Sequence, residues 1–89
     1  MTKSRNLTNS FPVKEYEKLA GKYIAEKNYD VAIDYLNKLI HHKENLLYYT
    51  QIGFCYYETE LFNKSLNTFL KAYNYLLTPL FYDAKDSEK

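Results

Sequence analysis

The sequence has few of the residues that cross-link a small fold or form its tight turns. Its 89 residues include one Cys, two Gly, two Pro and no Trp. A single Cys cannot close a disulfide within the chain, and no Cys and His residues stand at the spacing of a zinc site, so no metal or other cofactor is expected. Two Gly and two Pro are too few for the many tight turns of a sandwich or barrel. The sequence therefore favours helices.

An excess of charge of one sign and long apolar runs are also missing. The 12 Lys and Arg residues are balanced by 11 Asp and Glu residues, so the broad basic field of a duplex-binding protein is absent and no nucleic-acid partner is expected. No run approaches the roughly 20 apolar residues of a membrane span, and polar residues 1–10 contain no signal-peptide core. We therefore expect no membrane partner and a cytoplasmic location, which also suits an unpaired thiol.

Aromatic rings are what the sequence has in abundance, with 11 Tyr and 5 Phe. A chain this short has only a thin stability margin, because little of its surface is buried on folding. Without a disulfide or metal, such a chain needs a very regular architecture or a partner.

Apolar residues recur at the three- and four-residue spacing of helices with one buried side. Four such stretches occur, and short polar breaks separate them. Helices are predicted over residues 12–27, 30–42, 46–59 and 63–77. The predicted organisation is a flexible N-terminal arm (1–10), a helical domain (11–78), and a capping segment with a polar tail (79–89).

The predicted helices form two pairs that repeat at an interval of 33 residues. Large residues match large ones, and small residues match small ones. The matched residues are Tyr16 and Tyr49, Leu19 and Ile52, Ala20 and Gly53, Tyr23 and Tyr56, Tyr29 and Phe62, Ala32 and Ser65, Leu36 and Phe69, and Leu39 and Ala72. Small residues let two antiparallel helices approach, and rings fill the space beside them. A repeat of this length is typical of stacked helical hairpins.

This pattern resembles the tetratricopeptide repeat (TPR) family, over about residues 13–45 and 46–78. The stretch from Asn28 to Lys38 is especially close to the family's turn and second helix. Leu39 replaces the usual Ala, and Glu44 stands where the first repeat's closing Pro would be. The resemblance implies an all-α fold: a right-handed α-α superhelix of two TPR helix hairpins (four helices) with a short C-terminal capping segment.

The resemblance also implies a concave groove, lined by the first helix of each repeat. The residues at groove positions are Lys14, Glu17, Lys18, Gly21, Ile24 and Ala25 in the first repeat, and Leu47, Thr50, Gln51, Phe54, Tyr57 and Glu58 in the second. Family members that grip a C-terminal carboxylate use Lys and Asn where this chain has Glu17 and Gly21. The apolar residues Leu47, Phe54 and Tyr57 instead favour an apolar peptide or helix as the occupant. The alternative is that Phe54 and Tyr57 pack under the C-terminal segment.

Residues that could support catalysis are few. His41 and His42 are adjacent, so on a helix they diverge by about 100° and cannot hold one ion together. Cys55 is expected to be a buried, inert thiol, because no basic neighbour on its helix face would lower its pKa. We therefore expect a protein that is not an enzyme.

Two surface features each have two possible roles. Lys14, Lys18 and Lys22 form a basic edge, which suits either a solvated face, with Lys22 paired to Glu26, or an acidic partner. The segment 80–82 (Leu-Phe-Tyr) is suited either to fold back over the last helix or to enter another subunit.

The function expected from these observations is a protein-protein interaction module that binds a peptide or helix of a partner protein in its groove. One alternative is a small TPR chaperone or assembly factor that shields a client protein. Another is a structural unit that forms a homodimer through its terminal repeat faces, because two repeats leave an end of the stack uncovered.

Overall fold

The computed structural model describes residues 11–88, and it describes the side chains of residues 11–77. Over this part of the chain the fold is all-helical, with four helices and no strand. The helices are α2 (Val13–Ala25), α3 (Tyr29–His42), α4 (Leu46–Glu58) and α5 (Phe62–Glu88). The first three agree with the sequence prediction to within two residues at each end.

Helix α5 differs from the prediction at its C-terminal end. The sequence predicts an end near Leu77 and a capping segment that starts at Pro79, whereas the helix is continuous to Glu88. Proline fixes φ at a helical value and removes one backbone donor, so it can lie inside a helix at the cost of one hydrogen bond and a steric strain. The predicted lid at 80–82 lies outside the described side chains, and the predicted arm lies outside the described residues.

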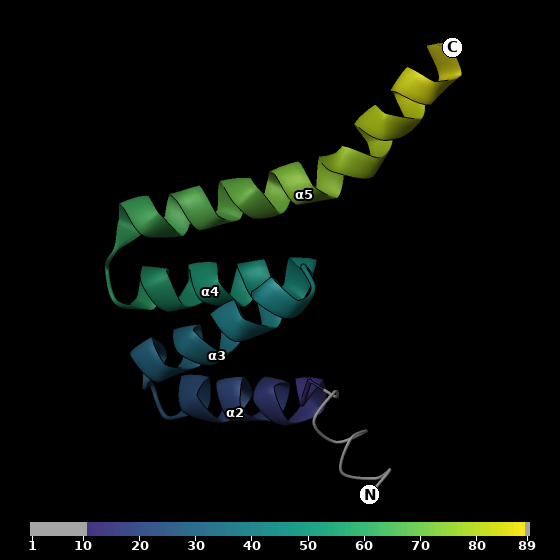
Figure 1. Cartoon of the computed structure of the whole chain (residues 1–89). Helices are drawn as coiled ribbons and strands as arrows, with labels where there is room; N and C mark the ends of the chain where they lie inside the picture. The colour runs from purple at the N-terminus through teal and green to yellow at the C-terminus, as the bar shows by residue number, and fades with distance from the viewer. Residues whose placement is uncertain (1–10, 89) are drawn as a thin grey trace, which may run out of the picture.

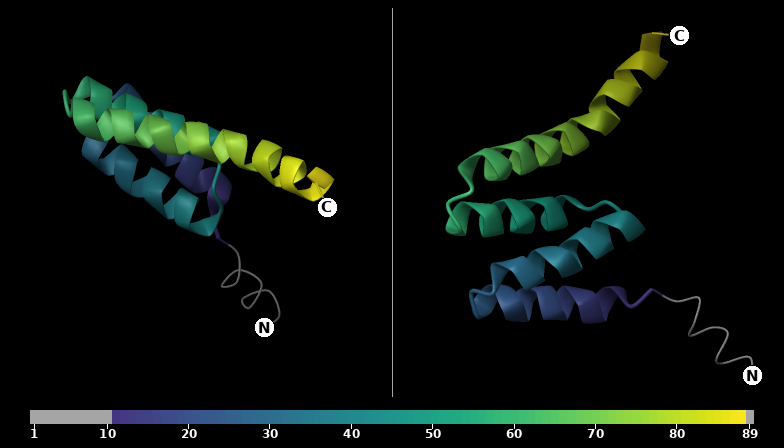
Figure 2. Two further views of the ribbon diagram at one scale, coloured as in Figure 1. Left: turned by 90° about the horizontal axis from the view of Figure 1, so that it is seen from above. Right: turned by 60° about the vertical axis from the view of Figure 1, so that its left-hand side comes forward.

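The helices are stacked in chain order. Helix α2 packs on α3, α3 on α4, and α4 on α5. Figure 1 shows this order from α2 at the bottom to α5 at the top, with successive helices running in opposite directions, and the right-hand view of Figure 2 shows the same order. Each helix is therefore held mainly by its neighbours in the sequence.

The two helix pairs repeat in the backbone at the predicted 33-residue interval. Val13–Ala25 corresponds to Leu46–Glu58, and the turns that follow have the same conformation. Lys27 and Glu60 both lie in the left-handed region, at φ 63° and 64°. Their amides donate to the carbonyl oxygens of Ile24 and Tyr57 at 2.9 and 3.0 Å. The interval found in the sequence is therefore an interval of the fold.

The largest buried cluster lies in the first three helices. It combines small residues at helix contacts with larger aliphatic and aromatic residues around them. Its buried members are Ala20, Ala32, Ile33, Leu36, Leu39, Tyr48, Ile52 and Cys55. This cluster contains residues of both helices of the first hairpin, α2 and α3, and of one side of α4. Helix α4 therefore joins the first repeat to the second.

Helix α5 packs closely on α4. The buried Ser65 hydroxyl donates to the carbonyl oxygen of Gly53 at 2.8 Å. The ring of Phe69 lies so close to Gly53 that a Cβ atom there would be 2.6 Å from the ring. Ala72 is also buried. The predicted close approach of small residues is therefore present at this contact.

The apolar stripe of α5 is only partly buried, as expected for a stack of two repeats with an uncovered end. Ala72 is buried, whereas the side chains of Leu66, Phe69 and Tyr73 are 58%, 41% and 57% exposed. Their positions match residues of α3 that α4 covers. Within the described residues no further helix lies against the corresponding side of α5, so these side chains stay half open to solvent.

Candidate partner-binding surface

Helix α4 carries apolar residues on two opposite sides. On one side Tyr48 and Ile52 are buried against the first hairpin. On the other side Leu47, Phe54 and Tyr57 are 55%, 43% and 57% exposed. A helix that is apolar all round is normally buried all round. Helix α4 therefore presents an apolar surface that the described residues leave partly exposed.

Two aromatic contacts orient the exposed rings of α4. Phe54 meets Tyr29, the first residue of α3, edge to face at 6.3 Å between ring centroids. Tyr57 meets Phe62, the first residue of α5, at 5.6 Å and 61°. Edge-to-face contacts at these distances are favourable. Each ring is therefore held in place while much of its surface stays accessible.

Tyr29 and Phe62 were not among the predicted groove residues. Both open the second helix of a repeat, and they are matched at the 33-residue interval. That match was visible in the sequence, but the contact across to the exposed side of α4 was not. Desolvation, and secondly the carboxylate of Glu58, raise the pKa of Tyr29 above 10.0.

A hydrogen bond connects α2 to α4 directly. The buried Tyr48 hydroxyl donates to Glu17 Oε2 at 2.5 Å. Burial, followed by the hydrogen bond to Glu17, raises the pKa of Tyr48 to about 12. The hydroxyl therefore stays protonated as a donor at neutral pH, and Glu17 fixes α2 against α4.

The predicted groove residues lie on the outer parts of α2 and α4, and we call this set the α2–α4 face. Its exposed members are Lys14, Glu17, Lys18, Gly21, Ala25, Leu47, Phe54, Tyr57 and Glu58, and its partly buried members are Ile24, Thr50 and Gln51. Ile24 packs against the core cluster, and the Thr50 hydroxyl donates to the Leu47 carbonyl at 2.8 Å. The face is thus apolar in its α4 part and charged in its α2 part.

The basic edge of α2 lies beside this face. Lys14, Lys18 and Lys22 line an open depression of about 640 Å³ together with Glu15 and Leu19. The predicted pair of Lys22 with Glu26 is present, at 4.0 Å. An exposed pair of this kind contributes little to stability. The other two Lys side chains are exposed and placed to meet acidic groups.

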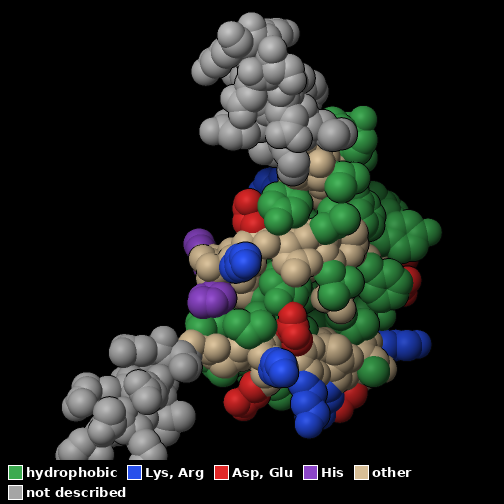
Figure 3. Space-filling model, turned by 90° about the vertical axis from the view of Figure 1, so that its right-hand side faces the viewer, with side chains coloured by type: hydrophobic (Ala, Val, Ile, Leu, Met, Phe, Trp, Pro, Cys, Tyr) green, Lys and Arg blue, Asp and Glu red, His purple; other side chains and the backbone are tan. Residues whose placement is uncertain are grey.

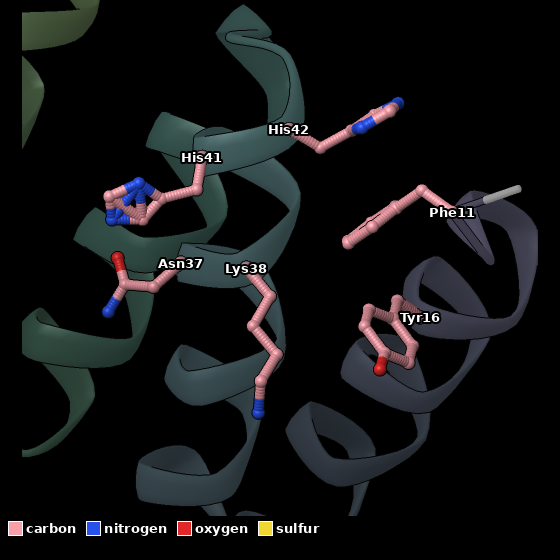
Figure 4. Close-up of a pocket in the computed structure, with 6 residues that line it drawn as sticks. All are labelled: Phe11, Tyr16, Asn37, Lys38, His41 and His42. Atoms are coloured by element: carbon pink, nitrogen blue, oxygen red, sulfur yellow. The ribbon is translucent and has the colours of Figure 1, made fainter. Parts of the chain in front are cut away.

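The histidines line a separate depression of about 480 Å³ at the C-terminal end of α3. The residues around it are Phe11, Tyr16, Asn37, Lys38, His41 and His42. Figure 4 shows the two imidazole rings pointing apart, as predicted for adjacent residues on a helix. His42 stacks on Phe11, with ring centroids 4.4 Å apart and planes 6° from parallel. This contact attaches the start of the described chain to α3.

Cys55 is fully buried, as predicted. Burial raises the pKa of its thiol from 9.0 to about 11, so the sulfur is protonated at neutral pH. A protonated, inaccessible thiol is a poor nucleophile. Across the described residues, no group of three or more His, Cys, Asp and Glu side chains could hold a metal ion.

In the part of the chain that the structure describes, no helix is long and apolar enough to cross a membrane. No protein-family model, curated protein or solved structure matches the chain.

Proposed function

We propose that the chain is a protein-protein interaction module of the tetratricopeptide type. It binds a peptide or helix of a partner protein across the α2–α4 face and catalyses no reaction of its own. The arrangement we propose is a right-handed superhelix of two hairpins, with α2 and α4 on its concave side. It is supported by the backbone repeat, by the matched left-handed turns at Lys27 and Glu60, and by the packing of each helix on the next.

The observation that carries the proposal is the exposure of Leu47, Phe54 and Tyr57 on a helix whose other side is buried. Aromatic side chains can bury about 150–250 Å² each and dominate the binding energy of many interfaces. Phe54 and Tyr57 are held by Tyr29 and Phe62, so little conformational entropy is lost when a partner covers them. These rings are the proposed anchors.

Polar residues around the anchors set the register of the bound segment. Lys14, Lys18, Gln51 and Glu58 offer charges and an amide at the rim, where such groups contribute more to specificity and association rate than to affinity. Glu17 and Thr50 are already engaged within the fold. Their proposed role is to hold α2 and α4 in place for the anchors.

The test is affinity capture with matched variants. Phe54→Ala combined with Tyr57→Ala removes both anchors and should abolish capture of a partner protein, while the helical circular dichroism persists. The matched control is Leu70→Ala combined with Tyr73→Ala, which also truncates one large aromatic and one other large apolar side chain of similar exposure. It should capture the same partner as the wild type. Equal capture by the Phe54/Tyr57 variant and the wild type would refute the proposal.

A further inference from the structure

Helix α5 carries a second apolar surface, which adjoins the α2–α4 face where Phe62 contacts Tyr57. Its residues alternate at spacings of four and three, which is the spacing of a seam between paired helices. The residues at that spacing are Phe62, Leu66, Phe69, Tyr73 and Leu76, and Leu70 lies beside them. All six side chains are exposed. We call this set the α5 face.

The first repeat shows what the corresponding residues do when a helix covers them. Ile33 and Leu36 of α3 match Leu66 and Phe69 of α5 at the 33-residue interval. Ile33 and Leu36 are only 9% and 0% exposed, because they lie in the core cluster with residues of α4. The α5 face therefore has the chemistry of a surface that packs on a helix.

The α5 face carries no charge. From 62 to 77 the charged residues are Lys64 and Lys71. The Lys64 ammonium lies over the Tyr56 ring of α4 at 5.7 Å, and Lys71 lines a small cavity shared by α3, α4 and α5. Both therefore lie toward the rest of the fold, so no like-charge repulsion opposes two α5 faces that meet.

The opposite end of the stack does not offer a matching surface. Helix α2 presents Lys14, Lys18 and Lys22 around Leu19. In the view of Figure 3, the acidic and basic side chains gather mainly in the lower part, at the level of α2, and hydrophobic side chains dominate above them. A second copy is therefore better suited to meet α5 than α2, which gives a closed pair and not a fibre.

The area of the α5 face fits a pair of this kind. Its six large side chains are each roughly half exposed, which leaves on the order of 100 Å² apiece and about 600 Å² per chain. A standard interface buries about 800 Å² per partner, and the largest apolar patch of a monomer is typically about 300–600 Å². With its polar margins, the α5 face reaches the size of an interface.

We propose that the α5 face binds the α5 face of a second copy of this chain, so that the protein forms a symmetric dimer. Side chains of each seam fill the spaces between those of the other, as in paired helices. The dimer leaves the α2–α4 face of each copy free. The two proposals share only Phe62, which contacts Tyr57, and their test variants are at different residues, so this proposal can fail independently of the proposed function.

The test is sedimentation equilibrium of the full chain over a range of concentrations. The wild type should sediment as a dimer that dissociates on dilution. Leu66→Glu and, separately, Tyr73→Glu should shift it to monomer, because each places a charge in the seam of both copies. Both residues are exposed, and unchanged circular dichroism confirms that each variant folds. The matched control is Leu47→Glu, an equally exposed leucine on the α2–α4 face, which should remain dimeric.

Three results would overturn the proposal. A wild-type chain that is monomeric at every concentration excludes the dimer and assigns the α5 face to a helix of another protein. Folded Leu66→Glu and Tyr73→Glu variants that both remain dimeric place the interface elsewhere. Loss of the dimer in Leu47→Glu alone moves the interface to the α2–α4 face.

Discussion

The ring of Phe69 on α5 occupies the space that a side chain at Gly53 on α4 would need. A Cβ at Gly53 would lie 2.6 Å from Phe69 Cε1 and 2.7 Å from Cζ. In the first repeat the same two positions hold Ala20 and Leu36, both fully buried. The second repeat thus has Gly53 in place of the larger Ala20, and Phe69 in place of the smaller Leu36. The two changes in side-chain size compensate each other.

Gly53→Ala is expected to destabilise the fold by a net of about 1–2 kcal/mol, since the overpacked contact with the Phe69 ring costs more than the roughly 0.5–1 kcal/mol that alanine gains in helix propensity. Adding Phe69→Leu recreates the Ala20/Leu36 combination and should restore part of the loss. Urea denaturation of the wild type, both single variants and the double variant measures this coupling.

Gly21 is the matched control for Gly53. It also lies inside a helix, but a Cβ there would meet no atom within 4 Å. Gly21→Ala should therefore stabilise the protein by about 0.5–1 kcal/mol through better helix propensity. If both alanine variants shift the unfolding midpoint equally, the contact with Phe69 does not restrict Gly53.

Lys27 and Glu60 occupy the left-handed conformation that favours glycine. An L-residue with a side chain is strained there by about 1–2 kcal/mol. Lys27→Gly and Glu60→Gly should each raise the free energy of unfolding by up to about 1 kcal/mol, after the entropic cost of glycine in the unfolded chain is subtracted. Thermal and urea unfolding measure the gain.

Glu26→Gly is the control for these turn variants, because Glu26 has φ −84° and gains nothing from glycine. It should lower stability slightly. A drop in stability for Lys27→Gly as large as that for Glu26→Gly would show that the left-handed conformation at Lys27 is not strained.

Ser65 joins α5 to α4 through its buried bond to the Gly53 carbonyl. Ser65→Ala should cost about 1 kcal/mol, since it removes this hydrogen bond with little change in volume. Thr68→Ala is the control, because its hydroxyl bonds only to Lys64 of its own helix, and it should change stability by less. Equal losses for the two variants would contradict the role given to Ser65.

Stability is expected to fall at alkaline pH. The pKa values of Tyr48 and Tyr49 are raised from 10.0 to about 12 by burial and then by hydrogen bonds to Glu17 and Glu44. Burial also raises that of Cys55 from 9.0 to about 11. Because the folded values exceed the unfolded ones, the stabilisation is complete below pH 9.0 and is lost as the pH rises through about 12.

Urea denaturation at a series of pH values, for the wild type and for Tyr48→Phe combined with Tyr49→Phe, measures this effect. Without the two hydroxyls, the parts of the alkaline loss due to Cys55 and Tyr29 should remain, so the variant's stability should change less between pH 10.0 and about 12. Identical alkaline profiles for the two proteins would show that these tyrosines titrate as they do in the unfolded chain.

Much of the helical architecture could be predicted from the sequence, because apolar spacing and helix length are local properties. The bounds of α2, α3 and α4 follow from it. The small residues at Ala20 and Gly53 also indicated where helices approach. The turn conformations could not be predicted, since neither Lys27 nor Glu60 is a glycine that would signal positive φ.

The candidate site was predicted less completely. The exposed residues of α4 followed from their positions in the repeat, but the bond from Tyr48 to Glu17 joins residues on separate helices and needs the folded geometry. The exposure of Leu66 and Tyr73 agrees with the uncovered end expected for two repeats, but the individual residues that stay exposed needed the folded structure. Apolar spacing shows which side of a helix is suited to pack against another helix. It does not show whether that other helix belongs to the same chain.

The most direct test of partner binding is amide chemical-shift mapping of the labelled chain during titration with the binding segment of the captured partner. We expect the largest shifts at Leu47, Phe54 and Tyr57, and little change at Leu70 and Tyr73. Shifts confined to α5, or no shifts at a saturating concentration of the segment, would contradict binding at the α2–α4 face.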